Sequence, residues 1–222
     1  MPEIQIITTA DGSHSLLNAD LQETYHSSYG AIQESKHVFI RSGLDYWVEH
    51  NPRKKIRILE MGFGAGLNAF LTLLATTHSD TPVYYESWEM YPVVQSVIAQ
   101  LNYGDILNSS QKFISLHEAL WEKQVAITPN FVLSKHNGDI QSAPFEESSF
   151  DIIYYDAFAP SKQPELWVEE MLKKVTNTLA PGGVWVTYCA KGQVKRDLRS
   201  LGLTVEILQG APGKKEMIRA LR

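Results

Sequence analysis

Four acidic side chains in this sequence each follow a short apolar run. Glu60 closes IRILE, Glu89 closes YYESWE, Asp139 follows FVLSKHNG, and Asp156 closes FDIIYY. Such runs predict buried strands, so each carboxylate is expected at a strand end. There it can accept hydrogen bonds from a ligand or take up a proton. The alternatives are ordinary turns, which Asp often begins, and, for the second run, Glu86 in place of Glu89.

A glycine-rich loop separates the first of these strands from a helix. ILEMGFGAGLN places Gly62, Gly64 and Gly66 there, where glycine permits positive φ and close approach to a ligand. The dinucleotide fingerprint G-x-G-x-x-G would need glycine where this chain has Leu67, and the Gly-Lys-Ser/Thr of a P-loop is absent. A purely structural turn is the alternative. The pattern E-x-G-x-G-x-G resembles motif I of class I S-adenosylmethionine (SAM) methyltransferases, whose cofactor carries an amino group and a sulfonium.

The stretch YYDAFAPSKQPELW predicts the reactive side of the site. An alkylammonium has no lone pair, so it must lose a proton before it can attack a methyl group, and a carboxylate can hold the amine and take that proton. We expect Asp156 to orient an amine, Phe158 to wall the pocket or stack on a base, and Pro160 to stiffen the loop. Much of the acceleration would come from proximity and orientation. The stretch departs from the Asn/Asp-Pro-Pro-aromatic signature of many amine-methylating enzymes.

Strands alternate with helices along the rest of the chain. This order predicts an α/β fold in which helices cover both faces of a mostly parallel sheet, with ligands at the carboxyl ends of its strands. GAPGKK is too short for a crossover helix, so the last two strands should pair antiparallel. With motif I, the expectation is a Rossmann-like class I SAM-dependent methyltransferase fold with seven strands and an antiparallel last strand. Strands are expected over 56–61, 82–90, 131–140, 150–156, 184–190, 203–210 and 216–221, and helices over 67–78, 93–101, 165–179 and 194–202.

The N-terminal part has a different pattern. IQIITTADGSHSLLN alternates around Asp11-Gly12 and predicts a hairpin, and residues 25–50 are mostly helical, closing at Asn51-Pro52. We therefore expect an N-terminal hairpin and helical extension over 1–52, packed on a methyltransferase domain over 53–222.

Composition limits the class of protein. The 222 residues include one cysteine, Cys189, which excludes a disulfide framework or a cysteine zinc cluster. The histidines show no H-E-x-x-H or other metal spacing, so no metal is expected. Trp88, Trp121, Trp167 and Trp185 are expected to pack in the core. We expect no signal peptide, because the N-terminus lacks a basic region followed by an apolar core. No run approaches the roughly 18 apolar residues of a membrane helix, so a cytoplasmic protein is expected.

Charge is unevenly distributed along the chain. Eight Lys or Arg and three Asp or Glu lie between Lys191 and Arg222, a balance of +5, whereas the whole chain has −5 and the rest therefore −10. By itself this distribution is more often a solvated helix face, and its alternative is a polyanionic partner at the C-terminal end.

Taken in order, the motifs resemble the MnmC and MnmD family of tRNA-modifying methyltransferases. The resemblance extends from about Tyr25 to Met217 and is carried by GAIQESKHVFI, ILEMGFGAGLN, ESWEMYP, NGDI, YYDAFAPSKQPELW, LAPGGVWVTYCAKGQVKRDL and GAPGKKEMI. It implies that SAM methylates the aminomethyl nitrogen of 5-aminomethyl-2-thiouridine at the tRNA wobble position, U34, giving 5-methylaminomethyl-2-thiouridine. We expect this chain to lack the FAD-dependent oxidase domain of bifunctional members, so another route must supply the amine, or the substrate differs.

The same resemblance implies roles for individual residues, with Asp156 as the catalytic one. The implied cofactor residues are Tyr29, Glu60, Gly62, Phe63, Gly64, Gly66, Asn68, Glu89, Gly138, Asp139 and Asp156. The implied substrate side comprises Gln33, Glu34, Phe158 and Pro160, and Lys191, Lys195, Arg196, Lys214 and Lys215 would meet phosphates of the anticodon arm. The alternative is a class I methyltransferase acting on a small-molecule or protein amine. A binding module without turnover is disfavoured by Asp156, and a nicotinamide oxidoreductase is disfavoured by Leu67.

Overall fold

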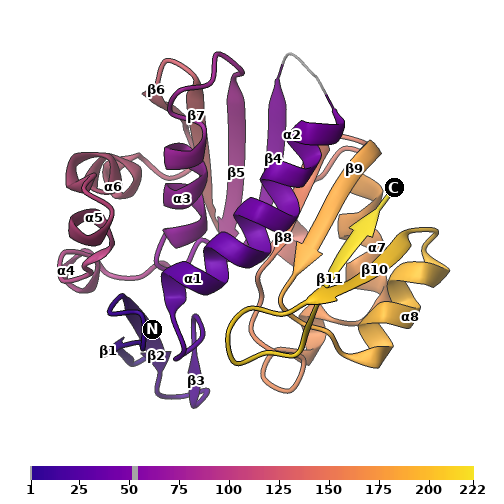
Figure 1. The fold of residues 1–222 in the computed structure, drawn as a ribbon, viewed down its shortest axis with the longest axis horizontal. Helices are drawn as coiled ribbons and strands as arrows, with labels where there is room; N and C mark the ends of the chain where they lie inside the picture. Colours follow the sequence, from indigo (N-terminus) through magenta and orange to yellow (C-terminus); the bar gives the residue numbers. More distant parts are fainter. Residues whose placement is uncertain (1, 52–54) are drawn as a thin grey trace.

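The main sheet of the computed structural model has eight strands within residues 2–51 and 55–222, the part of the chain that the structure describes (Figure 1). Their order across the sheet is β10-β11-β9-β8-β4-β5-β7-β6. The strands are β4 (Ile56–Met61), β5 (Val83–Glu89), β6 (Gln124–Thr128), β7 (Phe131–Asn137), β8 (Phe150–Tyr155), β9 (Leu179–Thr187), β10 (Thr204–Gln209) and β11 (Glu216–Leu221).

Strand pairing confirms the expected topology and adds one strand to it. β4 pairs in parallel with β5 and β8, β5 with β7, and β8 with β9, whereas β11 is antiparallel to both β9 and β10. The eighth strand, β6, was not predicted and pairs antiparallel with β7 at the sheet edge, with a register shift between Ala126 and Thr128. Only Pro129 and Asn130 separate the two strands, so a tight hairpin turn creates this extra edge.

Helices cover both faces of the sheet, because consecutive residues of its central strands point to opposite faces and are apolar on both. Ile152 and Tyr154 of β8 belong to one core cluster, and their neighbours Ile153 and Tyr155 belong to the other. The first cluster includes residues of α3 (Leu67–Ala75) and α6 (Ser110–Glu118). The second includes residues of α7 (Glu169–Thr178) and α8 (Gly192–Ser200).

A long helical run crosses the first face beside α3 (Figure 1). It consists of α1 (Ala31–Ser35), the π-helical η1 (Lys36–Asp45) and α2 (Tyr46–His50). Gly43 allows it to approach the sheet closely, because a Cβ there would lie 3.1 Å from Val186 and 3.2 Å from Tyr154. The expected helix over 25–50 thus begins later, at Ala31. Its expected end is confirmed as far as Asn51, because α2 ends at His50 and Asn51 is its C-cap. The boundary between 1–52 and 53–222 falls at residues 52–54, which are outside the described residues, so that division stays a proposal.

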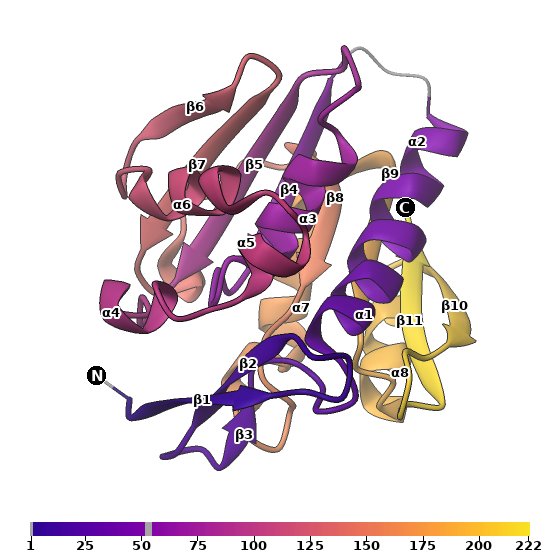
Figure 2. The ribbon, with the colours of Figure 1, turned by 60° about the vertical axis from the view of Figure 1, so that its left-hand side comes forward.

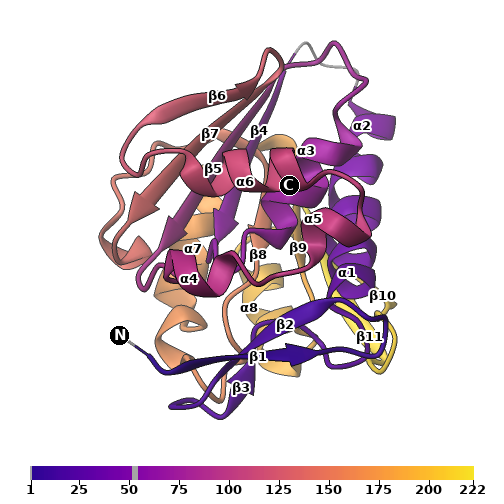
Figure 3. The same cartoon turned by 90° about the vertical axis from the view of Figure 1, so that its left-hand side faces the viewer.

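The N-terminal hairpin is confirmed and forms a small second sheet. β1 (Ile4–Thr8) pairs antiparallel with β2 (His14–Asn18), and β2 with the two-residue β3 (Glu23–Thr24). The views in Figures 2 and 3 show this sheet lying across the end of the main sheet where β4, β5 and β8 finish. It therefore covers the edge at which a parallel sheet binds its ligands.

The remaining elements are short and modify two expectations. The predicted helix over 165–179 divides into a 3-10 turn, η3 (Pro164–Leu166), and α7, while β9 begins at Leu179 and so includes the APGG that was expected to precede it. α4 (Gln95–Ile98), α5 (Tyr103–Ile106) and η2 (Ile140–Ser142) complete the described elements. Across residues 2–51 and 55–222, no helix has the length and apolar character needed to cross a membrane.

Candidate active site

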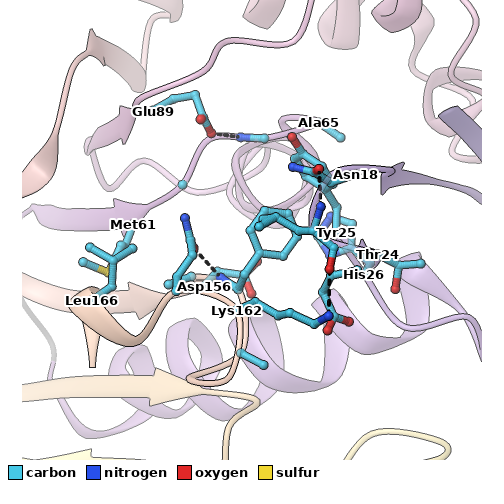
Figure 4. Close-up of a pocket in the computed structure, with 18 of the residues that line it drawn as sticks. Asn18, Thr24, Tyr25, His26, Met61, Ala65, Glu89, Asp156, Lys162 and Leu166 are labelled. Atoms are coloured by element: carbon cyan, nitrogen blue, oxygen red, sulfur yellow. Dashed lines mark hydrogen bonds between the residues drawn. The ribbon is translucent and has the colours of Figure 1, made fainter. Parts of the chain in front are cut away.

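A cavity of about 850 Å³ lies between the carboxyl ends of the central strands and the N-terminal sheet. Figure 4 shows Asn18, Tyr25 and His26 of the N-terminal segment on one side, and Met61, Glu89 and Asp156 of the main sheet on the other. Of the expected site residues, those that line the cavity are Tyr29, Glu34, Gly62, Phe63, Gly64, Asn68, Glu89, Gly138, Asp139, Asp156, Phe158 and Lys214.

The glycine loop has the backbone conformation that its composition predicts. Gly62, Gly64 and Gly66 have φ values of 86°, 48° and 71°, which side-chain-bearing residues rarely adopt. A Cβ on Gly64 would also lie 3.0 Å from the Tyr25 ring. Gly66 does not line the cavity; it precedes α3, and a Cβ there would meet His117 at 2.8 Å. The loop therefore needs glycine both for conformation and for space.

Glu89 connects the end of β5 to this loop. Its Oε2 accepts a hydrogen bond of 2.9 Å from the backbone N–H of Gly64 (Figure 4). Its Oε1 accepts one of 2.9 Å from the backbone N–H of Tyr91. Burial raises the pKa of the Glu89 carboxyl, and these backbone donors oppose that effect. The carboxylate is thus held on the cavity wall at the end of the second strand in the chain order of the domain.

Asp156 lies directly after β8 and is held by the first helix. The side-chain amide of Asn68 on α3 donates a hydrogen bond of 2.8 Å to Asp156 Oδ2. Burial, and next the negative charge of Glu34, raise the pKa of Asp156 to about 7, although the Asn68 hydrogen bond and Lys214 oppose this. A carboxyl with this pKa can exchange a proton near neutral pH, as a general base must.

Glu60 does not reach the cavity, in contrast to its expected contact with a ligand. It is fully buried on β4 and accepts a hydrogen bond of 2.7 Å from Ser87 on β5. Burial raises its pKa to about 8, with the hydrogen bond from Ser87 opposing. The physical reason is the strand alternation: Glu60 precedes the strand end by one residue and points into the protein.

Asp139 combines the two interpretations that its sequence left open. It lines the cavity, and its Oδ1 also accepts a hydrogen bond of 2.9 Å from the backbone N–H of Gln141, as an Asp that begins a turn does. Its neighbour Gly138 donates a backbone hydrogen bond of 3.0 Å to Glu89 O, which joins the ends of β5 and β7.

The loop after Asp156 is fixed by its own side chains. Gln163 accepts a hydrogen bond of 3.0 Å from the Phe158 N–H, and Trp167 Nε1 donates one of 2.8 Å to Phe158 O. The Phe158 ring packs edge-on against Tyr25, with ring centroids 5.0 Å apart. Pro160 is outside the cavity lining, which agrees with its expected role in stiffening the loop.

The basic residues expected at tRNA phosphates are in different surroundings. Lys214 faces the cavity and forms an ion pair of 2.6 Å with the buried Glu34, so it is not part of the open surface expected to meet phosphates. Lys195 pairs with Glu216 at 2.6 Å. Lys191, Arg196 and Lys215 are exposed, and none of these three forms an ion pair with the residues that the structure describes. Gln33 is also exposed and outside the cavity lining.

The sequence interpretation missed further lining residues, and four of them contribute to the argument below: Tyr25, Trp88, Lys162 and Tyr188. Trp88, expected in the core, lines the cavity and stacks on His136 with centroids 4.6 Å apart. Trp88 and Tyr188 lie at strand ends, and that position is the signal that could have identified them. Tyr25 and Lys162 have no such signal. Lys162 Nζ donates a hydrogen bond of 2.7 Å to Leu21 O and so joins the loop after β8 to the N-terminal segment.

Residues 103–222 match the family of S-adenosyl-L-methionine-dependent methyltransferases. The chain belongs to this family. The expected fold class and cofactor are therefore confirmed. The wider comparisons agree with the expected MnmC and MnmD relationship.

The most informative relatives are MnmC proteins. The chain is 29% identical over 206 residues to the "tRNA 5-methylaminomethyl-2-thiouridine biosynthesis bifunctional protein MnmC" of Leptospira borgpetersenii, covering 88% of this chain and 32% of the relative. The Pseudoalteromonas atlantica protein of that name is 29% identical over 231 residues, covering 96% and 32%. The crystal structure of MnmC2 from Aquifex aeolicus is similar, with a TM-score of 0.80, 29% identity, and coverage of 99% of this chain and 70% of that one. The chain thus spans about a third of the length of the two MnmC relatives.

The cavity residues fit a SAM cofactor. Glu89 offers acceptors for ribose hydroxyls at a strand end, as in other nucleotide-binding parallel sheets. The positive-φ glycines leave backbone atoms of the loop accessible. Asn68 Oδ1 is buried and has no hydrogen-bond partner among the described residues, so a donor on a ligand would satisfy it.

Proposed function

We propose that this chain transfers the methyl group of SAM to the aminomethyl nitrogen of 5-aminomethyl-2-thiouridine at position U34 of tRNA. The observation that carries the proposal is Asp156. This carboxyl lies in the cavity at the end of β8, has a pKa raised to about 7, and is oriented by Asn68. The names of the MnmC relatives supply the substrate class, because they refer to the biosynthesis of the methylated nucleoside in tRNA.

The chemistry asked of the protein is modest. SAM, when bound, supplies a methyl group that is already activated by a positively charged sulfur. The residues of this chain must remove a proton from the substrate ammonium and hold the nitrogen in line. Asp156 is the acceptor for that proton, and the Asn68 hydrogen bond fixes the direction of its carboxylate. Phe158 and Tyr25 form an aromatic wall against which an unpaired base can stack.

We assign the other cavity residues by position. Glu89 and the glycine loop are on the cofactor side, and Glu34, Phe158 and Lys162 are on the substrate side. Glu60 and Gly66 support the loop from outside the cavity. The proposed cofactor contacts are Tyr29, Gly62, Phe63, Gly64, Asn68, Glu89, Gly138, Asp139 and Asp156.

The proposed tRNA face is smaller than the sequence predicts. Lys191, Arg196 and Lys215 are exposed and available for phosphates of the anticodon arm, whereas Lys195 and Lys214 are paired. Contacts to phosphate release counterions, so the affinity for tRNA should fall steeply as salt is raised. A tRNA substrate would also place the protein in the cytoplasm.

The decisive experiment is methyl transfer from labelled SAM to tRNA purified from cells that lack this protein. Mass spectrometry of the digested nucleosides should show 5-methylaminomethyl-2-thiouridine, and anticodon-arm sequencing should assign it to U34. Transfer to tRNA that is already methylated is the negative control. SAM binding without any methylated nucleoside would contradict the proposal.

One observation favours a second candidate, a methyltransferase for a small-molecule or protein amine. The pairing of Lys195 and Lys214 with Glu216 and Glu34 leaves fewer free cations for a polyanion. Transfer to polyamine-like acceptors, with none to tRNA, would support this candidate. Both candidates need the same cofactor residues and the same proton acceptor.

A further inference from the structure

The loop between β10 and β11 brings a lysine to the cavity from the far end of the chain. Lys214 lines the cavity, and its Nζ lies 2.6 Å from Glu34 Oε1 and 3.9 Å from the centroid of the Tyr188 ring. Its neighbour Lys215 is exposed. Two adjacent lysines in GAPGKK therefore have different environments.

Glycines give the loop the shape that delivers Lys214. Gly213 has φ +83°, and a Cβ there would lie 2.2 Å from the Tyr29 ring. Gly210 has no room for a Cβ either, because that atom would lie 2.6 Å from Lys214 O. The loop is thus packed against Tyr29 and closed on itself, so Lys214 is held in place by backbone conformation as well as by its ion pair.

Glu34 is the other half of the pair and is fixed on both oxygens. It lies on α1, is 5% exposed, and its Oε2 accepts a hydrogen bond of 2.7 Å from the backbone N–H of Ser27. Its Oε1 faces Lys214. Losing one partner would leave a buried charge without compensation, which is strongly destabilising in proteins.

We propose that Glu34 and Lys214 form a positioning pair for Asp156, which balances the charge around its carboxylate. This inference rests on the proposed function. Lys214 would then act inside the site, and not as a contact to a tRNA phosphate. Neither residue is the proton acceptor.

The charges that face Asp156 make this balance specific. Asp156, Glu34 and Lys214 line the same cavity. After burial, the charge of Glu34 raises the pKa of Asp156, whereas the charge of Lys214 lowers it. Three further groups interact with Asp156: Glu60 on β4, Tyr85 on β5 and Tyr188 after β9. Near the pair, burial lowers the pKa of His26 to about 4, which keeps this ring neutral at pH 7. With Asp156 ionised, Asp156, Glu34 and Lys214 sum to −1, so the site attracts a cationic amine.

A titration of Asp156 in the full chain without SAM or tRNA tests the pair. The carboxyl carbon is followed by ¹³C NMR against pH and assigned with Asp156→Asn. Glu34→Gln should lower the midpoint, because Lys214 then acts alone, and Lys214→Met should raise it, each by about one pH unit. Lys215→Met is the matched control, because it removes the adjacent positive charge outside the cavity, and its midpoint should stay close to that of the unsubstituted protein.

Gly213→Ala is a second route to the same result, because a side chain against Tyr29 must displace the loop that carries Lys214. Its midpoint should shift upward, as in Lys214→Met. An upward shift or no shift in Glu34→Gln would overturn the proposal, as would equal shifts for Lys214→Met and Lys215→Met. The titration needs no substrate, so a failure of tRNA methylation and a failure of the pair are separate results. Where methylation is observed, the pH of half-maximal rate should follow the same order.

Discussion

The side-chain amide of Asn68 donates a hydrogen bond of 2.8 Å to Asp156 Oδ2, although 88 positions separate them in the chain. The bond connects the helix after the glycine loop to the end of β8. It therefore links the part of the site proposed to hold the cofactor with the part proposed to take the proton. Any displacement of the loop would also move the orienting donor of Asp156.

Replacing Asp156 by Asn should remove methyl transfer while cofactor binding is kept. The amide has nearly the same shape but cannot accept a proton at neutral pH, so the rate should fall by about 10²- to 10⁴-fold. Single-turnover transfer to tRNA gives the rate, and calorimetry gives the SAM affinity. Asp80→Asn, the same change at an exposed residue outside the cavity, is the control. Full activity in Asp156→Asn would remove its assigned role.

The same substitution should change stability in a pH-dependent way. The folded-state pKa of Asp156 is raised to about 7 from an ordinary value of 3.8, so folding favours the neutral carboxyl. Its stabilising contribution is complete below about pH 3.8 and is lost as pH rises through 7. Asp156→Asn has no such loss. Between about pH 5 and pH 8, its free energy of unfolding should therefore rise relative to that of the unsubstituted protein. Urea unfolding of both proteins at about pH 5 and about pH 8 measures the difference between their free energies of unfolding. The same difference at both pH values would contradict the assigned pKa.

Glu89→Ala should weaken SAM binding. The variant leaves the N–H groups of Gly64 and Tyr91 without their acceptor and loses the cavity carboxylate. A hydrogen bond from a ligand to a charged group is worth about 1.5–3 kcal/mol, so SAM affinity should fall by roughly 10- to 150-fold. Calorimetry is the measurement. Glu86→Ala is the matched comparison, because Glu86 lies on the same strand, accepts a hydrogen bond of 3.0 Å from Trp88 Nε1 and does not line the cavity. Unchanged affinity in Glu89→Ala, or a larger loss in Glu86→Ala, would refute the choice of Glu89.

Gly64→Ala should reduce both stability and SAM affinity. A side chain at φ 48° costs about 1–2 kcal/mol, and its Cβ would also press on Tyr25 at 3.0 Å. Gly202→Ala separates the two effects, because Gly202 has φ +87° and a Cβ there would meet nothing within 4 Å. Thermal unfolding should show a loss in both variants, whereas calorimetry should show weaker SAM binding in Gly64→Ala alone. Equal SAM affinities would exclude a role for the loop conformation in binding.

The parts of the site that depend on local order could be predicted from the residue pattern. A strand has a fixed direction and alternates its faces, so Glu89, Asp139 and Asp156 at strand ends had to meet at one edge of a parallel sheet. The glycine loop was also predictable, because its backbone conformation depends on the residue type at each position. The short GAPGKK connection also determined the antiparallel pairing of β10 and β11.

Contacts between side chains of different elements could not be predicted, because they depend on how the folded elements pack together. Tyr25 reaches Gly64 and Phe158 because the N-terminal sheet folds over the strand ends, and no local pattern specifies that packing. Glu60 lies below the cavity surface. Lys214 and Lys215 have the same charge and adjacent positions, yet one is paired with the buried Glu34 and the other is exposed. The physical reason is that the environment of a charged side chain depends on partners distant in sequence, whereas strand direction and glycine conformation are properties of the local chain.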